Sequence, residues 1–205
     1  MGKIKIKKAD VWIDMTPMSD VMTLLLCFFM LTSTFTKPEP VKVVTPASVS
    51  EIKVPEKDVL NILVDKEGKV FMSMDNQNDL QAVFEDVTGQ YSGLGITAKQ
   101  EKNFLADPMF GTPVKDLAAY LAKDEMGRQE VLKTQGIPLD SIDGGMSEFQ
   151  TWVKSARQTN KDIKIALKSD SETPYKVIKR VMDELASIEE NRYYLITQLK
   201  TDKED

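Results

Sequence analysis

The chain has 205 residues, a net charge of −5, no histidine and a single cysteine. The lack of histidine excludes Ser-His-Asp and Cys-His catalysis and His-ligated zinc, and one cysteine permits neither an internal disulfide nor a Cys-based metal site. The sequence also lacks a Gly-rich phosphate loop and the spacing of a calcium loop. We therefore expect no enzyme, no cofactor and no bound metal.

Basic residues are concentrated at the start of the chain, which carries Lys3, Lys5, Lys7 and Lys8. The remaining 23 basic residues stand against 32 acidic ones, so the rest of the chain has a net charge of −9. An acidic region of this kind disfavours contact with nucleic acid or anionic lipid, and we expect no nucleic-acid partner. Residues 1–15 are taken as a short N-terminal segment.

Residues 16–35, TPMSDVMTLLLCFFMLTSTF, form the only stretch that is apolar enough to cross a membrane. About twenty helical residues, at ~1.5 Å each, cover a hydrocarbon core of about 30 Å. Thr16 is a capping residue and Pro17 is tolerated at the first helical position, so a helix is predicted to begin there. Four lysines precede the span, and only Lys37 follows it directly. Because basic residues stay on the cytoplasmic side of a membrane, this difference predicts a cytoplasmic N-terminus and an exported remainder.

A cleaved signal peptide is the competing interpretation of this segment. The apolar run is long for such a peptide, and no A-x-A-like cleavage site follows it. Leu26, directly before Cys27, also disfavours lipoprotein processing, which needs a small residue there. We therefore predict an uncleaved anchor with a single crossing.

Asp20 lies about one turn inside the predicted membrane helix. An ionised carboxylate at membrane depth costs roughly 2.5–3.5 kcal/mol on insertion scales, so an intramembrane Asp is a candidate functional residue. Hydrocarbon disfavours the charged form, and the group can alternate between the protonated and ionised states as its surroundings change. No Lys, Arg or His lies between Asp14 and Thr36 to neutralise it. Asp20 is the predicted proton carrier.

A polar stripe accompanies Asp20 along the helix. At about 100° per residue, Thr16, Thr23, Cys27 and Thr34 project on the same side as Asp20. These residues are predicted to face a partner helix or to line a proton pathway, because lipid offers them no hydrogen bonds. The alternative is that the threonine hydroxyls bond to carbonyl groups of their own helix.

Residues 36–58 are predicted to be an extended, semi-stiff linker because they contain four prolines, Pro38, Pro40, Pro46 and Pro55. Within it, the β-branched run 41–44 (VKVV) is a candidate edge strand, in which Val41, Val43 and Val44 would pair with an open sheet edge.

Residues 59–205 are predicted to fold as a small two-layer α+β domain with helices on one face of a sheet. Alternating residues on both sides of Gly68 predict a β-hairpin, and Asn78 is predicted to cap a helix that runs to about Tyr91. Residues 92–160 are predicted to be a helical insert, with helices near 113–126 and 146–155. The end reads as a strand at 162–168, a helix capped by Thr173 with Pro174 at its first position, and a strand at 192–199. The buried face of that last helix is predicted to be Tyr175, Val177, Ile178, Val181, Met182 and Leu185.

The run IDMTPMSDVMTLLLCFFMLT, residues 13–32, resembles the signature of the ExbD/TolR family of biopolymer transport proteins, and is most like ExbD. The linker VKVVTPAS is similar to the extended motif that follows the anchor in ExbD proteins. The end of the chain, with KSD followed by Pro174 and Tyr175, resembles the last strand, helix and strand of the family. Two features depart from the family pattern: Asp14 stands where Asn is more usual, and the segment 92–160 is longer than in the compact family domain.

The resemblance implies a subunit driven by the proton-motive force in a bacterial inner membrane, with a periplasmic C-terminal domain. It implies that Asp20 carries protons within a channel formed with an ExbB-like multi-helix subunit, that Thr16 and Pro17 complete the motif, and that the chain forms a self-dimer. The exported domain would pass energy to a TonB-like protein for outer-membrane transport. Two alternatives remain open: a TolR-like subunit with a TolA-like partner, and a membrane-anchored scaffold without proton transport.

Overall fold

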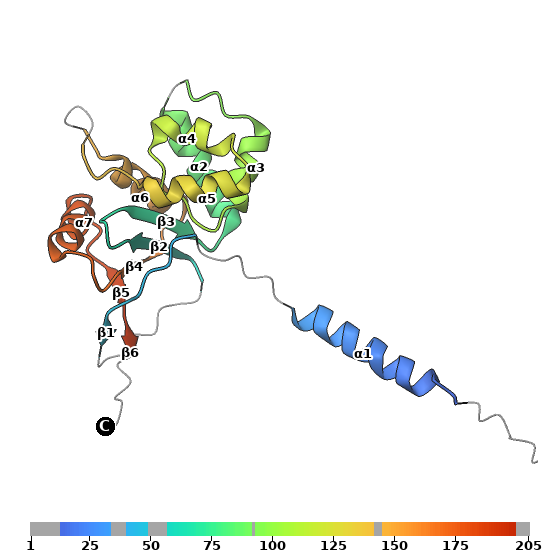
Figure 1. Ribbon diagram of the computed structural model, residues 1–205. Helices are drawn as coiled ribbons and strands as arrows, with labels where there is room; N and C mark the ends of the chain where they lie inside the picture. The colour runs from blue at the N-terminus through green and yellow to red at the C-terminus, as the bar shows by residue number, and fades with distance from the viewer. Residues whose placement is uncertain (1–12, 34–39, 49–56, 92, 142–144, 200–205) are drawn as a thin grey trace, which may run out of the picture. The chain divides into compact units, whose positions relative to one another are not determined.

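The computed structural model describes residues 13–33, 40–48, 57–91, 93–141 and 145–199. The chain divides into two compact units, one spanning residues 1–37 and the other residues 38–205. Among the described residues, the first unit contains helix α1, and the second contains the strands and the other helices (Figure 1). None of the helices in the described part of the chain combines the length and the apolar character that a membrane crossing requires.

Helix α1 spans Thr16–Thr32, with Pro in its first turn, and has no buried residue. The predicted role of Thr16 as the capping residue is wrong. The N-cap position is Met15, which makes no side-chain cap, and Thr16 is the first helical residue. Its backbone amide donates to the Asp14 carboxylate, which takes up a hydrogen-bond donor that helix geometry leaves free. The helix ends at Thr32, whereas the predicted span runs on to 35.

The second unit is α+β, as predicted, and is built on a four-stranded mixed sheet with the strand order β3-β2-β4-β5. Strands β2 (Val59–Val64) and β3 (Val70–Met74) form the predicted hairpin. Its turn contains Gly68 at φ +82°, a conformation that favours glycine. Strand β4 (Lys164–Ser169) runs parallel to β2, and β5 (Tyr193–Ile196) runs parallel to β4.

Three helices accompany the sheet: α2 (Gln77–Gln90), α6 (Glu148–Thr159) and α7 (Tyr175–Ser187). The cap of α2 is Asn76 and not Asn78, because the Asn76 side chain accepts the Asn78 amide. Thr173 does not cap α7 as predicted. Its hydroxyl donates to the Asp65 carbonyl, and Pro174 is the N-cap residue. On α7, Val181 and Leu185 are buried as predicted, whereas Tyr175 is 70 % exposed.

Within the predicted insert, residues 92–160, the three helices that precede α6 lie together in Figure 1: α3 (Ala98–Ala106), α4 (Val114–Leu121) and α5 (Glu125–Thr134). The prediction missed α3, and it merged the start of α5 with α4. Helix α6 begins two residues later than predicted, and its N-cap Ser147 forms a capping box with Gln150.

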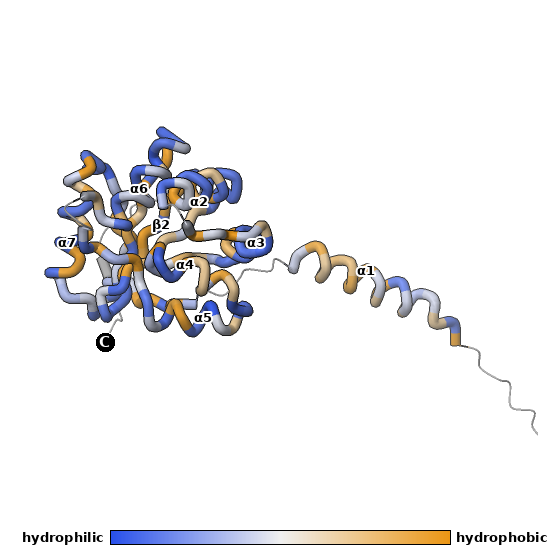
Figure 2. Tube along the Cα trace, turned by 90° about the horizontal axis from the view of Figure 1, so that it is seen from above, coloured by the Kyte–Doolittle hydropathy of each residue, from blue (hydrophilic) through white to orange (hydrophobic). Residues whose placement is uncertain are grey.

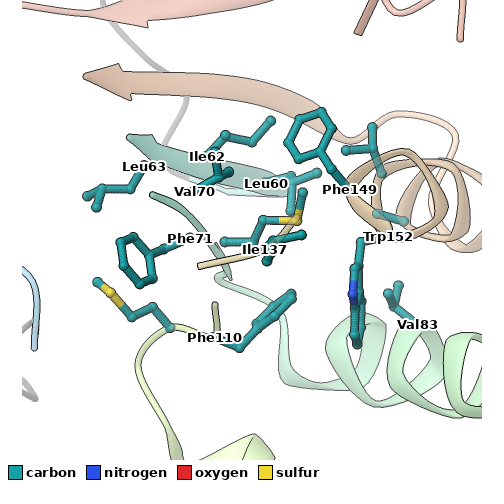
Figure 3. Close-up of a cluster of buried hydrophobic side chains, with 14 of the residues drawn as sticks. Leu60, Ile62, Leu63, Val70, Phe71, Val83, Phe110, Ile137, Phe149 and Trp152 are labelled. Atoms are coloured by element: carbon teal, nitrogen blue, oxygen red, sulfur yellow. The ribbon is translucent and has the colours of Figure 1, made fainter. Parts of the chain in front are cut away.

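The core joins the sheet to α2, α6 and the insert. Figure 3 shows Phe149 and Trp152 of α6 and Val83 of α2 on the side of the sheet where Leu60 lies. The rings of Phe84, Phe104, Phe110 and Trp152 form one cluster, with neighbouring centroids 4.4–6.0 Å apart. Two insert segments also contact β3: Phe110 and Met72 exchange backbone hydrogen bonds of 2.8 and 2.9 Å, and the Ile137 amide donates to the Val70 carbonyl. The insert therefore covers the β3 edge of the sheet.

The predicted strand at 41–44 is wrong in position. The described strand in this segment is β1 (Ala47–Ser48), which pairs in parallel with β6 (Gln198–Leu199) in a separate two-stranded sheet. Val41 is buried in the core, Val43 is half-buried and Val44 is exposed. The segment packs on the domain before it reaches a strand.

Candidate functional site

The side chain of Asp20 is exposed on α1. It lines a shallow recess of about 490 Å³ together with Met15, Thr16, Ser19 and Thr23. Three of these neighbours carry hydroxyl groups, so the carboxyl group has polar company on its own helix. Figure 2 shows how hydropathy changes along α1. The helix is mostly pale or orange, and a hydrophilic blue segment lies toward its N-terminal end.

Two hydroxyl groups near Asp20 already donate hydrogen bonds. The Thr16 hydroxyl donates to Asp14 Oδ1 at 2.6 Å, and the Thr23 hydroxyl donates to the Ser19 carbonyl at 2.9 Å. The Thr23 contact is the alternative arrangement that the sequence left open, in which a hydroxyl bonds to its own helix. Both oxygens keep lone pairs, so they can still accept a hydrogen bond from a protonated carboxyl group or from water.

Asp14 lies just before α1 and differs from Asp20 in its bonding. The hydrogen bonds from the Thr16 hydroxyl and from the Thr16 amide hold the pKa of the Asp14 carboxyl below its usual range. A carboxylate that is held ionised in this way at a helix N-terminus acts as a fixed anion. Its contacts give Asp14 the role of anchoring the start of the helix.

The rest of the predicted stripe is only partly described. Cys27 is a free, exposed thiol on α1, and Thr34 lies outside the described residues. Large apolar side chains cover the rest of α1 and are all exposed: Val21, Met22, Leu24, Leu25, Leu26, Phe28, Phe29, Met30 and Leu31. A contiguous apolar surface of this extent marks a lipid or protein contact.

Val44 is the linker residue whose backbone bonds to the loop after β4, within the second unit. The Val44 amide donates to Asp170 Oδ2 at 2.9 Å, and the Val44 carbonyl accepts the Ser171 amide at 2.8 Å. The structure thus connects Val44 to the loop after β4 and not to a sheet edge.

Sequence reasoning missed two residues of these sites. Ser19 lies in the Asp20 recess, and its place directly before Asp20 in the motif was available as a signal. Asp170 is the last residue of the KSD run, residues 168–170. Its position between a predicted strand and a Thr-Pro helix start is typical of a side chain that bonds to loop amides, but its partner in the linker is 126 residues away.

One of three comparisons with known proteins finds a match. The family model described as "Biopolymer transport protein ExbD/TolR" matches residues 7–200. No curated protein and no solved structure matches the chain. The proteins of this family are membrane-associated transport proteins that act in complexes with partners, and they are not enzymes. Because the family match takes in the helix that carries Asp20 and every described strand, the chain belongs to the ExbD/TolR family of biopolymer transport proteins.

Proposed function

We propose that this chain is the proton-carrying subunit of an ExbB–ExbD-type motor in a bacterial inner membrane. Residues 16–35 cross the membrane once with the N-terminus in the cytoplasm, the linker 36–58 follows, and residues 59–205 form a periplasmic domain. Asp20 carries the proton. Family membership supports an energy-transducing role in biopolymer transport, and the observation that carries the proposal is the placement of Asp20 in a hydroxyl-lined recess on an otherwise apolar helix.

The chemistry requires partners. Asp20 has no Lys or Arg on its own helix, so an ionised carboxylate needs polar groups from other chains. A multi-helix ExbB-like subunit and a second copy of this chain would enclose the recess, with Thr16, Thr23, Cys27 and Thr34 lining the pathway. One proton that moves down a membrane potential supplies roughly 2.3 kcal/mol per 100 mV. Protonation neutralises Asp20, and release of the proton restores a charge that must move toward polar surroundings.

The test is Asp20→Asn in the full complex, with Asp14→Asn as the matched control. The two substitutions remove the same charge six residues apart, but only Asp20 is the proposed proton carrier. We expect Asp20→Asn to co-purify with the membrane partner and to lose energy-dependent transport, while Asp14→Asn keeps it. Full transport by the Asp20→Asn protein would overturn the proposal.

The two alternatives make different predictions. A scaffold in which Asp20 only joins chains predicts that Asp20→Asn, which can still form hydrogen bonds, keeps both assembly and function. A TolR-like role with a TolA-like partner predicts a loss of outer-membrane integrity in the Asp20→Asn strain, whereas an ExbD-like role with a TonB-like partner predicts a loss of outer-membrane transport.

A further inference from the structure

Asp170 lies between the end of β4 and the start of α7 and is only 8 % exposed. Its two carboxylate oxygens have different partners. Oδ1 accepts the Glu172 amide at 2.9 Å, and Oδ2 accepts the Val44 amide at 2.9 Å. The Asp170 amide donates to the Val64 carbonyl at the end of β2, which fixes the backbone of the loop to the sheet.

Val44 takes part in this contact through its backbone. Its amide and its carbonyl both bond to the loop after β4, through Asp170 and Ser171, whereas its side chain is 63 % exposed. The flanking residues Val41 and Thr45 are 7 % and 6 % exposed, so the linker on either side of Val44 is packed against the domain. We call this set of contacts, made by Val44, Asp170 and Ser171, the linker clasp.

A role confined to the turn before α7 accounts for only half of these bonds. An Asp at this position stabilises a loop by accepting the amide two residues later, and the Oδ1 contact with Glu172 does so. The Oδ2 contact serves a segment that is distant in sequence and that leads to the membrane helix. One side chain therefore joins the linker to the loop from which α7 begins.

The hydrogen bonds at the clasp favour an ionised Asp170. A recess of about 300 Å³ is lined by Lys42, Val44, Asp65, Lys66, Asp170, Ser171 and Glu172. The hydrogen bonds from the Glu172 and Val44 amides hold the pKa of the Asp170 carboxyl below its usual range, and the charge of Lys66 acts in the same direction. Hydrogen bonds to a charged acceptor are about twice as strong as neutral ones.

We infer that Asp170 is a positioning residue that fastens the linker to the periplasmic domain, so that a displacement of the membrane helix is passed to the loop ahead of α7. The inference rests on the proposed function for its mechanical meaning. The attachment itself rests only on the contacts within the second unit.

The experiment measures hydrogen exchange of the full-length protein in its membrane complex, in the segments 41–45 and 170–173. Asp170→Asn leaves one acceptor oxygen for two amides, and Glu172→Gln is the matched control because the Glu172 side chain is exposed. Val44→Pro removes the donor amide without removing a buried side chain, and Val44→Ala keeps that amide. We expect Asp170→Asn and Val44→Pro to raise exchange in these segments roughly ten- to hundredfold, with β2 and β4 unchanged and both controls like wild type.

The transport assay separates the two parts of the inference. With an intact core, we expect Asp170→Asn and Val44→Pro to reduce transport, while Val44→Ala and Glu172→Gln retain it. Unchanged exchange in both clasp variants would overturn the attachment. Faster exchange with full transport would overturn the transmission of movement through it. A failure of the proposed function has a different signature, which is full transport by Asp20→Asn with the exchange results as expected.

Discussion

At the scale of single residues, the insert contains a buried ion pair, whose two charges must compensate each other because water cannot. Arg128 donates to both oxygens of Asp107 at 2.9–3.1 Å, and the two side chains are only 7 % and 8 % exposed. The Tyr120 hydroxyl donates to the same carboxylate at 2.8 Å. Burial and the Asp107 charge both raise the pKa of Tyr120, so this phenol remains protonated and keeps donating. These three side chains join α4 and α5 to Asp107, the residue directly after α3.

Replacing Arg128 tests how much this pair contributes to the free energy of unfolding. Arg128→Met leaves the Asp107 carboxylate buried without its cation, and we expect the free energy of unfolding to fall by about 3–5 kcal/mol. The control is Arg180→Met, which breaks an exposed pair with Asp140 and should cost less than about 1 kcal/mol. Urea unfolding followed by circular dichroism gives both values. Equal effects would show that the buried pair has no special importance.

Glu148 gives the domain a predictable pH dependence. It is 2 % exposed, accepts the Val114 amide at 2.8 Å at the start of α4, and has a raised pKa because it is buried. When the folded pKa exceeds the unfolded one, the stability from this group is fully present below the unfolded pKa and is lost as the pH rises through the folded pKa.

We expect Glu148→Gln to remove this pH dependence while keeping an oxygen for the Val114 amide. The difference in free energy of unfolding between the Gln variant and wild type should therefore shift in favour of the variant as the pH rises above about 4.5. Urea unfolding at several pH values between 4 and 8 measures it. A difference that does not change with pH would contradict the raised pKa.

At the scale of the elements, two glycines allow the insert to approach β3. A Cβ atom at Gly111 would lie 2.1 Å from the Phe71 ring, and one at Gly136 would lie 3.0 Å from the Val70 amide nitrogen. These positions coincide with the two backbone contacts that cover the β3 edge. The close approach thus depends on residues without a side chain.

Gly111→Ala should lower the free energy of unfolding by about 1–3 kcal/mol, because the buried Phe71 ring has little room to move. Gly89→Ala in α2 is the opposite case. Nothing lies within 4 Å of its added Cβ, and alanine favours a helix, so stability should rise by up to about 1 kcal/mol. Thermal unfolding of the two variants decides the point. A neutral Gly111→Ala would mean that the insert can shift away from the strand.

Local sequence patterns predicted many of the helices and strands. They failed where contacts between residues distant in sequence determine the structure. The hairpin around Gly68 and the buried face of α2 follow from alternation and helical periodicity. Helix α3 was missed although Thr97 and Gln100 form a capping box, a signal that the sequence contains. The position of the linker was not predictable, because its partner Asp170 is recognised only once β4 and β2 are paired.

The candidate site was predictable to a different degree. Asp20 and its helix could be identified from the order of the residues, since a single carboxyl group stands out in an apolar run. The bonding of Thr23 to its own helix could not be separated from a role in lining a pathway, because both use the same side of α1.

At the scale of the whole molecule, the two edges of the four-stranded sheet, β3 and β5, have different neighbours. Insert segments bond to β3, while the described residues place no strand beyond β5. A sheet with two free edges can pair with another molecule at each edge, and repeated pairing of this kind leads to fibres. With one border shut, a side-by-side association through β5 uses the same edge on both molecules and is complete at two copies. The bonds between the insert and β3 thereby leave β5 as the edge of the described sheet at which a further strand can pair.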